Sequence, residues 1–161
     1  MDIRIGHGYD THPLIKEDSL ILGGVHIPHY KGIAGHSDGD VLTHAIIDSI
    51  LGAANLGDIG KIFPSSNEQL KGVSSLELLS KVMNIINQKS FKILNSDSTI
   101  ILEKPMIGEY INSIKSNIAS KLSLSIDKVS IKATTNDGLG FIGKEEGISA
   151  ISTILLIKEN Y

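Results

Sequence analysis

Histidines and acidic residues near the N-terminus of the chain have the types and spacing of metal ligands. They lie in two phrases, Gly-His-Gly-Tyr-Asp-Thr-His over residues 6–12 and His-Ser-Asp-Gly-Asp-Val-Leu-Thr-His over residues 36–44. Asp10 and His12 are two residues apart, so they point to the same side of an extended segment. His44 falls in a stretch whose apolar periodicity predicts a helix. Together they form the three-ligand set of a catalytic zinc ion, which keeps its fourth position open.

Two aspartates flank His44 at helical spacing. Asp40 and Asp48 are each four residues from His44 and therefore lie on its side of the predicted helix. A metal-bound histidine usually donates its second ring proton to a carboxylate, so Asp48 is a candidate to orient this imidazole. The alternative is that both aspartates simply solvate one face of the helix. The spacing leaves both interpretations open.

Two further segments combine glycine with polar side chains. Gly-Asp-Ile-Gly over residues 57–60 is either a tight turn alone or part of a binding loop. Residues 132–141 follow a predicted strand, where α/β folds place ligands, and contain hydroxyl groups suited to phosphate. Asp137 in this segment is a hard oxygen ligand suited to magnesium. On spacing alone a polar loop without a ligand is the simpler interpretation of this segment.

Composition limits the possible partners and compartments. The 161 residues are 41% hydrophobic and 20% charged, which is typical of a single soluble domain. A net charge of −3 gives no basic surface for nucleic acid or a membrane. The absence of cysteine excludes disulfides and thiolate chemistry, and no apolar stretch approaches the length of a membrane span. We expect a cytoplasmic bacterial protein, or one in an organelle stroma from which a transit segment was removed.

The elements that must hold these residues alternate between strands and helices. We expect an α/β fold (an α+β two-layer arrangement), a mixed β-sheet with helices packed on one face, in one domain over residues 1–161. Ser37 is the predicted N-cap of the first helix, and Ser74 with Glu77 predicts a capping box for the second. The strands are predicted at 3–9, 20–27 (turned at Gly23 and Gly24), 91–102, 129–133 and 147–157, and the helices at 41–54, 74–86 and 107–122.

Four phrases in a fixed order carry a family resemblance. They are the segment over residues 6–12, Ala-Gly-His-Ser-Asp-Gly-Asp-Val over 34–41, Leu-Gly-Ala-Ala-Asn-Leu-Gly-Asp-Ile-Gly over 51–60 and Lys-Ala-Thr-Thr over 132–135. The chain resembles the 2-C-methyl-D-erythritol 2,4-cyclodiphosphate synthase family of non-mevalonate isoprenoid biosynthesis, over essentially its whole length. Members are lyases that convert 4-diphosphocytidyl-2-C-methyl-D-erythritol 2-phosphate to the cyclic diphosphate and release CMP.

The resemblance implies roles for individual residues. Zinc would bind Asp10, His12 and His44, and a second divalent cation, Mg²⁺ or Mn²⁺, would bind Asp137. Thr135 would hold phosphate between the two metals. The methylerythritol phosphate end of the substrate would contact His36, Ser37, Asp58 and Gly60, and Phe63 is a further substrate-binding residue. The cytidine diphosphate end would contact Leu102, Pro105, Met106, Ala133, Thr134 and Thr135, with Phe141 and Lys144 as further substrate-binding residues.

The resemblance also implies an assembly. The family forms homotrimers with active sites between subunits, and Tyr9, Lys144 and Glu146 match positions near the three-fold axis, where some members hold an isoprenoid diphosphate. This chain departs from the family pattern at three positions: Asp137 replaces a glutamate, Met106 a lysine and Lys144 an arginine. The shorter Asp137 reduces the reach to the second cation, and Lys144 keeps the charge but loses the bidentate fork of arginine.

Two other functions use the same residues. A zinc-dependent phosphohydrolase would employ the same three ligands with water as the nucleophile, and would yield a linear product. A trimeric module that binds metal or diphosphate without turnover is the non-catalytic alternative. The cyclase needs no general base, because its nucleophile is a phosphate oxygen that is already largely ionised.

Overall fold

A five-stranded mixed sheet forms one layer of the molecule. The computed structural model describes residues 2–16, 18–35 and 37–159. The strand order is β4-β1-β7-β5-β6, and only β5 and β6 run parallel to each other. The strands of this sheet are β1 (Asp2–Lys16), β4 (Lys31–Ile33), β5 (Phe91–Ile101), β6 (Val129–Thr134) and β7 (Gly147–Lys158), and a separate hairpin consists of β2 (Leu20–Leu22) and β3 (Val25–Ile27).

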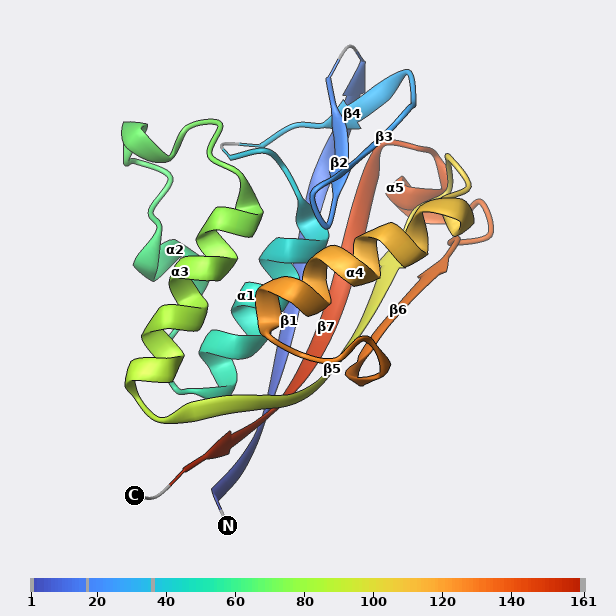
Figure 1. The fold of residues 1–161 in the computed structure, drawn as a ribbon. Coiled ribbons are helices and arrows are strands. Elements are labelled where there is room, and N and C mark those ends of the chain that lie inside the picture. The colour runs from blue at the N-terminus through green and yellow to red at the C-terminus, as the bar shows by residue number, and fades with distance from the viewer. Residues whose placement is uncertain (1, 17, 36, 160–161) are drawn as a thin grey trace.

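Three helices form the second layer, on one face of the sheet (Figure 1). They are α1 (Val41–Ala53), α3 (Ser75–Gln88) and α4 (Ile111–Leu122). Two single-turn helices, α2 (Ile59–Ile62) and α5 (Gly140–Gly143), lie in loops, and short 3₁₀ turns occur at Glu68–Leu70, Gly108–Tyr110 and Ile126–Lys128. The predicted mixed sheet with helices on one face is confirmed. Over the described residues, no helix combines the length and apolar character that a membrane crossing requires.

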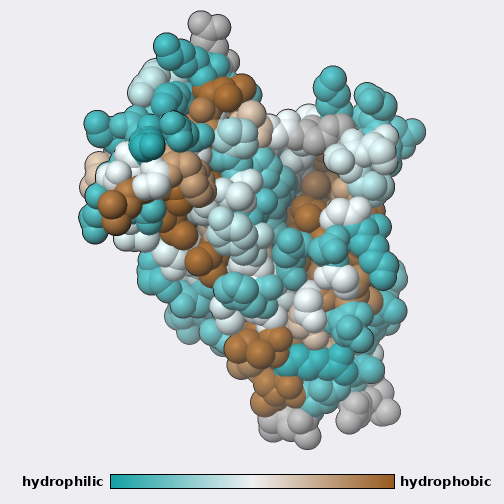
Figure 2. Space-filling model, turned by 180° about the vertical axis from the view of Figure 1, so that it is seen from behind, coloured by the Kyte–Doolittle hydropathy of each residue, from teal (hydrophilic) through white to brown (hydrophobic). Residues whose placement is uncertain are grey.

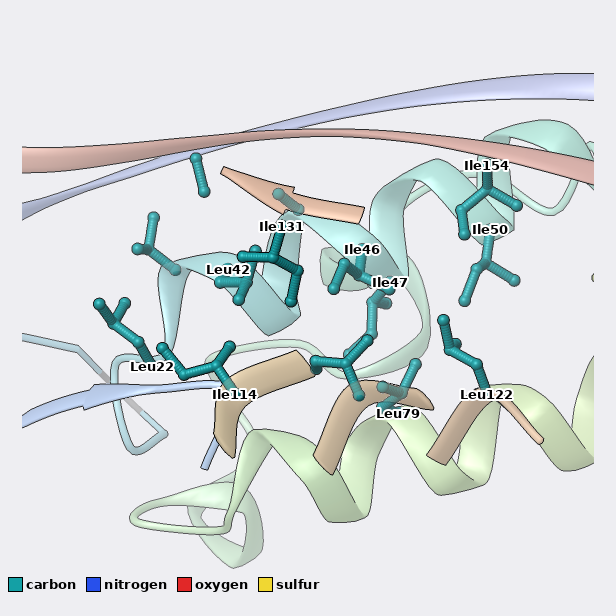
Figure 3. Packing of buried hydrophobic residues seen from close by; sticks show 14 of the residues in the cluster. Leu22, Leu42, Ile46, Ile47, Ile50, Leu79, Ile114, Leu122, Ile131 and Ile154 are labelled. Atoms are coloured by element: carbon teal, nitrogen blue, oxygen red, sulfur yellow. The ribbon is translucent and has the colours of Figure 1, made fainter. Parts of the chain in front are cut away.

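The layers share one core of aliphatic side chains. Figure 3 shows residues of α1 such as Ile46 and Ile50 lying between the sheet and the outer helices. Ile154 of β7, Leu79 of α3 and Ile114 of α4 are fully buried around them. Burying each such side chain contributes about 1.5–3 kcal/mol relative to leaving it in water. Aliphatic side chains of Ile, Leu, Val and Ala therefore form a continuous core, although aromatic residues are scarce in the sequence.

Two glycines set the distance between β1 and α1. A Cβ added at Gly6 would lie 1.8 Å from the carbonyl oxygen of Ser49, and one at Gly8 would lie 1.9 Å from that of Ala45. Only glycine permits this approach, so the helix backbone rests directly on the strand. Because side chains alternate along a strand, the even-numbered residues that follow also face α1. The glycines thus bring the β1 residues Asp10 and His12 toward the helix that carries His44.

The opposite face of the sheet is open. The odd-numbered β1 residues Ile3, Ile5 and Tyr9 are 49%, 72% and 51% exposed. Figure 2 shows this side of the molecule, with apolar side chains gathered near the end of the sheet where both termini lie. Among the described residues, no helix covers this face in Figure 1.

Several local predictions were wrong in detail. The N-cap of α1 is Asp40, whose carboxylate accepts hydrogen bonds from the Thr43 amide and hydroxyl. Ser37 instead lies beside His44. Ser74 is the N-cap of α3, but its side chain makes no capping hydrogen bond. The strand β1 extends to Lys16, because its last three residues pair with β4, an edge strand that was not predicted.

Candidate active site

Asp10, His12 and His44 converge although they come from two elements. The Nδ1 atoms of His12 and His44 lie 3.0 and 3.1 Å from the same oxygen, Oδ2 of Asp10. One ligand atom from each of the three lies within 4.8 Å of the others, and no other group of this kind is found in the described part of the chain. The sequence-predicted ligand set is therefore brought together by the fold.

The donor atoms fit a metal ion. Nδ1 of His12 is buried and has no hydrogen-bond partner, although Oδ2 of Asp10 is close to it. A buried polar atom without a partner is costly, and coordination removes that cost. Ligands at about 2.0–2.2 Å from a tetrahedral zinc ion are about 3.3–3.5 Å apart, which is close to the observed separations. Two imidazoles and one carboxylate are also the donor types that zinc prefers.

The charges in the cluster support one another. Burial raises the pKa of the Asp10 carboxyl, but its close contacts with the His12 and His44 rings outweigh burial and hold its pKa below the usual range. Burial lowers the pKa of His44, but Asp10, with smaller contributions from Asp40 and Asp38, outweighs it and raises that pKa. Without a metal, a proton on His44 thus takes the place of a cation beside Asp10.

The second nitrogen of His44 contacts serines, and Asp48 does not contact it. Nε2 lies 3.0 Å from Oγ of Ser37 and 2.9 Å from Oγ of Ser75. The prediction that Asp48 orients this imidazole was wrong, since its carboxylate accepts a 2.7 Å hydrogen bond from the amide of Ile59. Asp48 therefore fixes the start of α2 against α1. The helical spacing of Asp48 gave no information about which neighbour it would meet.

A cavity of about 230 Å³ is bordered by the cluster of Asp10, His12 and His44. Ser37, Gly60 and Phe63 border it, as the resemblance implied, together with Ser65 and Leu70 of the following loop. Asp58 does not line the cavity, and instead caps α2 by accepting from the Lys61 amide at 2.9 Å. Asp58 thereby places Gly60 at the rim. His36, predicted to bind the same end of a substrate, lies outside the described residues.

A second cavity, also of about 230 Å³, lies where the parallel strands β5 and β6 end. All six residues expected to contact the cytidine diphosphate end border it: Leu102, Pro105, Met106, Ala133, Thr134 and Thr135. The peptide bond before Pro105 is cis. Met106 is 81% exposed, so the apolar side chain that replaces the family lysine lies at the mouth of this cavity.

The loop after β6 is held by hydrogen bonds within the loop and by hydrogen bonds to Glu103. Thr135 Oγ1 donates to Oδ1 of Asp137 at 3.2 Å, and Asp137 adopts a left-handed backbone conformation with φ of 51°. The carboxylate of Glu103 accepts from the amides of Asn136 and Gly138 at 3.2 and 3.4 Å. Sequence reasoning missed Glu103. Its position two residues after β5, beside the end of a parallel strand, was the available signal.

Comparison with known proteins identifies the family. The model of the YgbB family matches residues 3–157. The 2-C-methyl-D-erythritol 2,4-cyclodiphosphate synthase of Clostridium acetobutylicum is 56% identical over 155 residues, which cover 96% of this chain and 100% of that protein. The chain belongs to the YgbB family. The enzyme of the same name from Alkaliphilus oremlandii is 53% identical, with 97% of this chain and 99% of that protein covered.

Solved structures of this family have the same fold. The bifunctional IspDF of Campylobacter jejuni matches with a TM-score of 0.94 at 37% identity, covering 99% of this chain and 43% of that longer protein. The IspF–CDP complex of Plasmodium falciparum matches with a TM-score of 0.85 at 38% identity, covering 98% and 97%. The predicted family and its enzyme class, a lyase of isoprenoid biosynthesis, are confirmed.

Within one chain of this YgbB-family protein, the predicted site residues lie in separate places. Asp137 is not part of the Asp10, His12 and His44 cluster, and the two cavities have no lining residue in common. Phe141 lies beside His12 at a third hollow of about 220 Å³, which Glu146 also borders. Lys144 is exposed, and the Tyr9 hydroxyl lies 3.3 Å from Oγ of Ser149 on the open face.

Proposed function

We propose that this chain converts 4-diphosphocytidyl-2-C-methyl-D-erythritol 2-phosphate to 2-C-methyl-D-erythritol 2,4-cyclodiphosphate with release of CMP. The observation that carries the proposal is the convergence of Asp10, His12 and His44, with the unpartnered Nδ1 of His12, in a chain of this family. A zinc ion on these three ligands would supply Lewis-acid stabilisation of charge on the diphosphate. An oxygen of the 2-phosphate forms the new bond to the β-phosphorus, and the bond to the CMP oxygen breaks.

The residues of the first cavity would hold the phosphorylated sugar. The Ser37 hydroxyl and the backbone at Gly60 border the space next to the metal ligands, and Phe63 closes it with apolar surface. No side chain is needed as a base, because a phosphate oxygen is largely ionised at neutral pH. The task of the protein is to bring two phosphates together, which oriented binding can favour by roughly 7–11 kcal/mol.

The second cavity would hold the cytidine diphosphate. The Plasmodium falciparum relative was solved as a CDP complex, and the predicted pocket residues of this chain border a single cavity. The hydroxyls of Thr134 and Thr135 lie at its rim and suit phosphate oxygens. Asp137, next to Thr135, would bind the second cation, Mg²⁺ or Mn²⁺, through an oxygen ligand.

A homotrimer would bring the two cavities together. The open sheet face carries the exposed Ile3, Ile5 and Tyr9, whose burial against neighbours would be favourable. In such an assembly each active site would combine the metal cluster of one subunit with the nucleotide cavity of its neighbour. Tyr9, Lys144 and Glu146 would then surround the axis, where an isoprenoid diphosphate could bind.

Phosphorus NMR with the purified protein, the proposed substrate, zinc and magnesium tests this function. The expected result is CMP together with the paired resonances of the cyclic diphosphate. CMP with a linear diphosphate would instead identify a hydrolase. An unchanged substrate spectrum from protein that contains zinc would identify a binding module, and either of these results would overturn the proposal.

A further inference from the structure

A short chain of polar groups links His44 to the start of α3. Ser75, the first residue of α3, is fully buried and places Oγ 2.9 Å from Nε2 of His44. The carboxylate of Asp38 contacts Ser75 twice, accepting from its amide at 2.9 Å and from its hydroxyl in a short hydrogen bond. Ser75 is 31 residues from His44 and 37 from Asp38 in the sequence, so the fold itself brings it to them.

The chain of hydrogen bonds has a fixed direction. A carboxylate only accepts, so the hydroxyl proton of Ser75 points to Asp38. Oγ of Ser75 can then offer His44 only a lone pair, and the imidazole must donate from Nε2. In the neutral imidazole the other nitrogen, Nδ1, then carries no proton. Nδ1 is the atom that faces Asp10 Oδ2 at 3.1 Å. In the charged imidazole a proton on Nδ1 joins these two atoms, and a bound metal ion would take the place of that proton.

Ser37 and Ser75 share the same nitrogen but have different surroundings. Ser37 borders the cavity beside the metal ligands, and its Oγ is 3.0 Å from Nε2. Ser75 is fully buried and is anchored by Asp38. A phosphate in the cavity can therefore take the Ser37 hydroxyl while Ser75 keeps its hydrogen bond to His44. Ser37 is thus free to bind a phosphate in the cavity, while Ser75 keeps His44 in place for the metal.

We propose that Ser75 and Asp38 are positioning residues for the metal, which fix His44 in the Nε2-protonated tautomer and so present Nδ1 to the ion. The identity of the ion rests on the proposed function, whereas the tautomer rests on the contact of Nε2 with Ser75 and of Ser75 with Asp38. Outer partners of metal-bound histidines typically change metal affinity by about 10–100-fold. Ser74, next to Ser75 but without a side-chain capping hydrogen bond, provides a matched control.

Zinc affinity, measured by competition with a chelating dye, is the first test. Ser75→Ala is expected to bind zinc about 10–100-fold more weakly than the wild-type chain, and Ser74→Ala within about twofold of it. Ser37→Ala should also bind zinc nearly normally. Equal zinc affinity in Ser75→Ala and Ser74→Ala would overturn the metal-positioning role. If the wild-type chain itself binds no zinc, the proposed zinc site fails and the tautomer measurement below decides the role of Ser75.

Nitrogen NMR of the histidine rings is the second test and needs no metal. In metal-free wild-type protein at about pH 9, well above the ordinary pKa of an imidazole, the neutral form of His44 should carry its proton on Nε2. Ser75→Ala should give a mixture of the two tautomers, whereas Ser74→Ala should leave the wild-type spectrum. Asp38→Asn, which replaces one acceptor oxygen by a donor, should also move the tautomer and covers the case that Ser75→Ala folds poorly. A wild-type His44 protonated on Nδ1 would overturn the proposal.

Discussion

The two cavities of this chain are built in opposite ways. The cavity at Asp10, His12 and His44 is bordered by half-buried or buried ligands, and each nitrogen of His44 has a neighbour that fixes it. The cavity at the ends of β5 and β6 has the exposed residues Met106, Thr134 and Thr135 at its border, and the two threonine hydroxyls donate to acceptors of their own loop. One half of the proposed site is complete in a single chain, and the other is an open surface.

The difference indicates which contacts hold each half of the proposed site in place, the metal half at Asp10, His12 and His44 and the nucleotide half at the ends of β5 and β6. The metal half is organised by α1 resting on the glycines of β1, and by α3 contacting His44 through Ser75. The nucleotide half is held by loop contacts such as that of Glu103 with the Asn136 amide, which are exposed to solvent. Exposed hydrogen bonds restrain a loop weakly, so we expect this half to gain order only against a neighbouring subunit or a ligand.

The largest expected effect comes from removing a metal ligand. His12→Ala or His44→Ala deletes one of three ligands, so each variant should lose bound zinc and nearly all turnover. Metal content by mass spectrometry of the native protein, together with CMP release, measures both. His26→Ala is a control, because this histidine lies on β3 outside the cluster. Stoichiometric zinc in either ligand variant would remove that residue from the ligand set.

A mixing experiment tests whether the two halves come from different subunits. His44→Ala damages the metal half, and Ala133→Trp should block the nucleotide cavity, so each variant alone should be inactive. In equal mixtures of reassembled trimers, about a quarter of the sites would combine two intact halves, and about a quarter of the wild-type activity should return. Sites contained within one chain would recover no activity, which would contradict the shared site.

A smaller effect is expected from the second cation ligand. Asp137→Ala removes an exposed carboxylate that is not part of the metal cluster, so zinc should stay bound. The concentration of magnesium or manganese needed for half-maximal CMP release should rise, by roughly tenfold for a ligand-sized loss of about 1.4 kcal/mol. Asp137→Glu restores the family residue and should lower it below the wild-type value. An unchanged metal-activation curve in both variants would place the second cation elsewhere.

The two halves also differ in how far the sequence predicted them. The metal ligands were predictable because residue type, strand alternation and helical periodicity are local properties. The glycines at 6 and 8 appeared in a motif, but their reason, the close approach of α1, required the packing. The partner of Asp48 was left open between His44 and solvent and proved to be neither, and Ser75 and Asp38 were missed, because these contacts depend on where α2 and α3 begin. Partners that are distant in sequence leave no local pattern.

The smallest expected effect concerns how the metal-free cluster of Asp10, His12 and His44 contributes to the stability of the fold at different pH values. The raised pKa of His44 means that its charged form stabilises the fold, fully below its ordinary pKa of about 6.5, and that this contribution is lost as pH rises through the folded-state pKa. The lowered pKa of Asp10 means that its ionised form stabilises the fold. This stabilisation is fully present above the ordinary pKa of about 3.9 and is lost as pH falls through the folded-state pKa. The pair therefore stabilises the metal-free chain most between these two ordinary values.

Denaturant unfolding of chelator-treated protein measures this contribution. The advantage of the wild-type chain over His44→Ala should be larger near pH 5.5 than near pH 8.5, because only the imidazolium attracts Asp10 strongly. Saturating zinc should reverse the trend, since metal binding requires unprotonated imidazoles and strengthens as pH rises. Variants of the exposed nucleotide half, such as Asp137→Ala, should show the wild-type pH profile. A wild-type advantage that is independent of pH without metal would mean that the pKa of His44 is the same in the folded and unfolded chain, and that its contact with Asp10 contributes little to the stability of the metal-free chain.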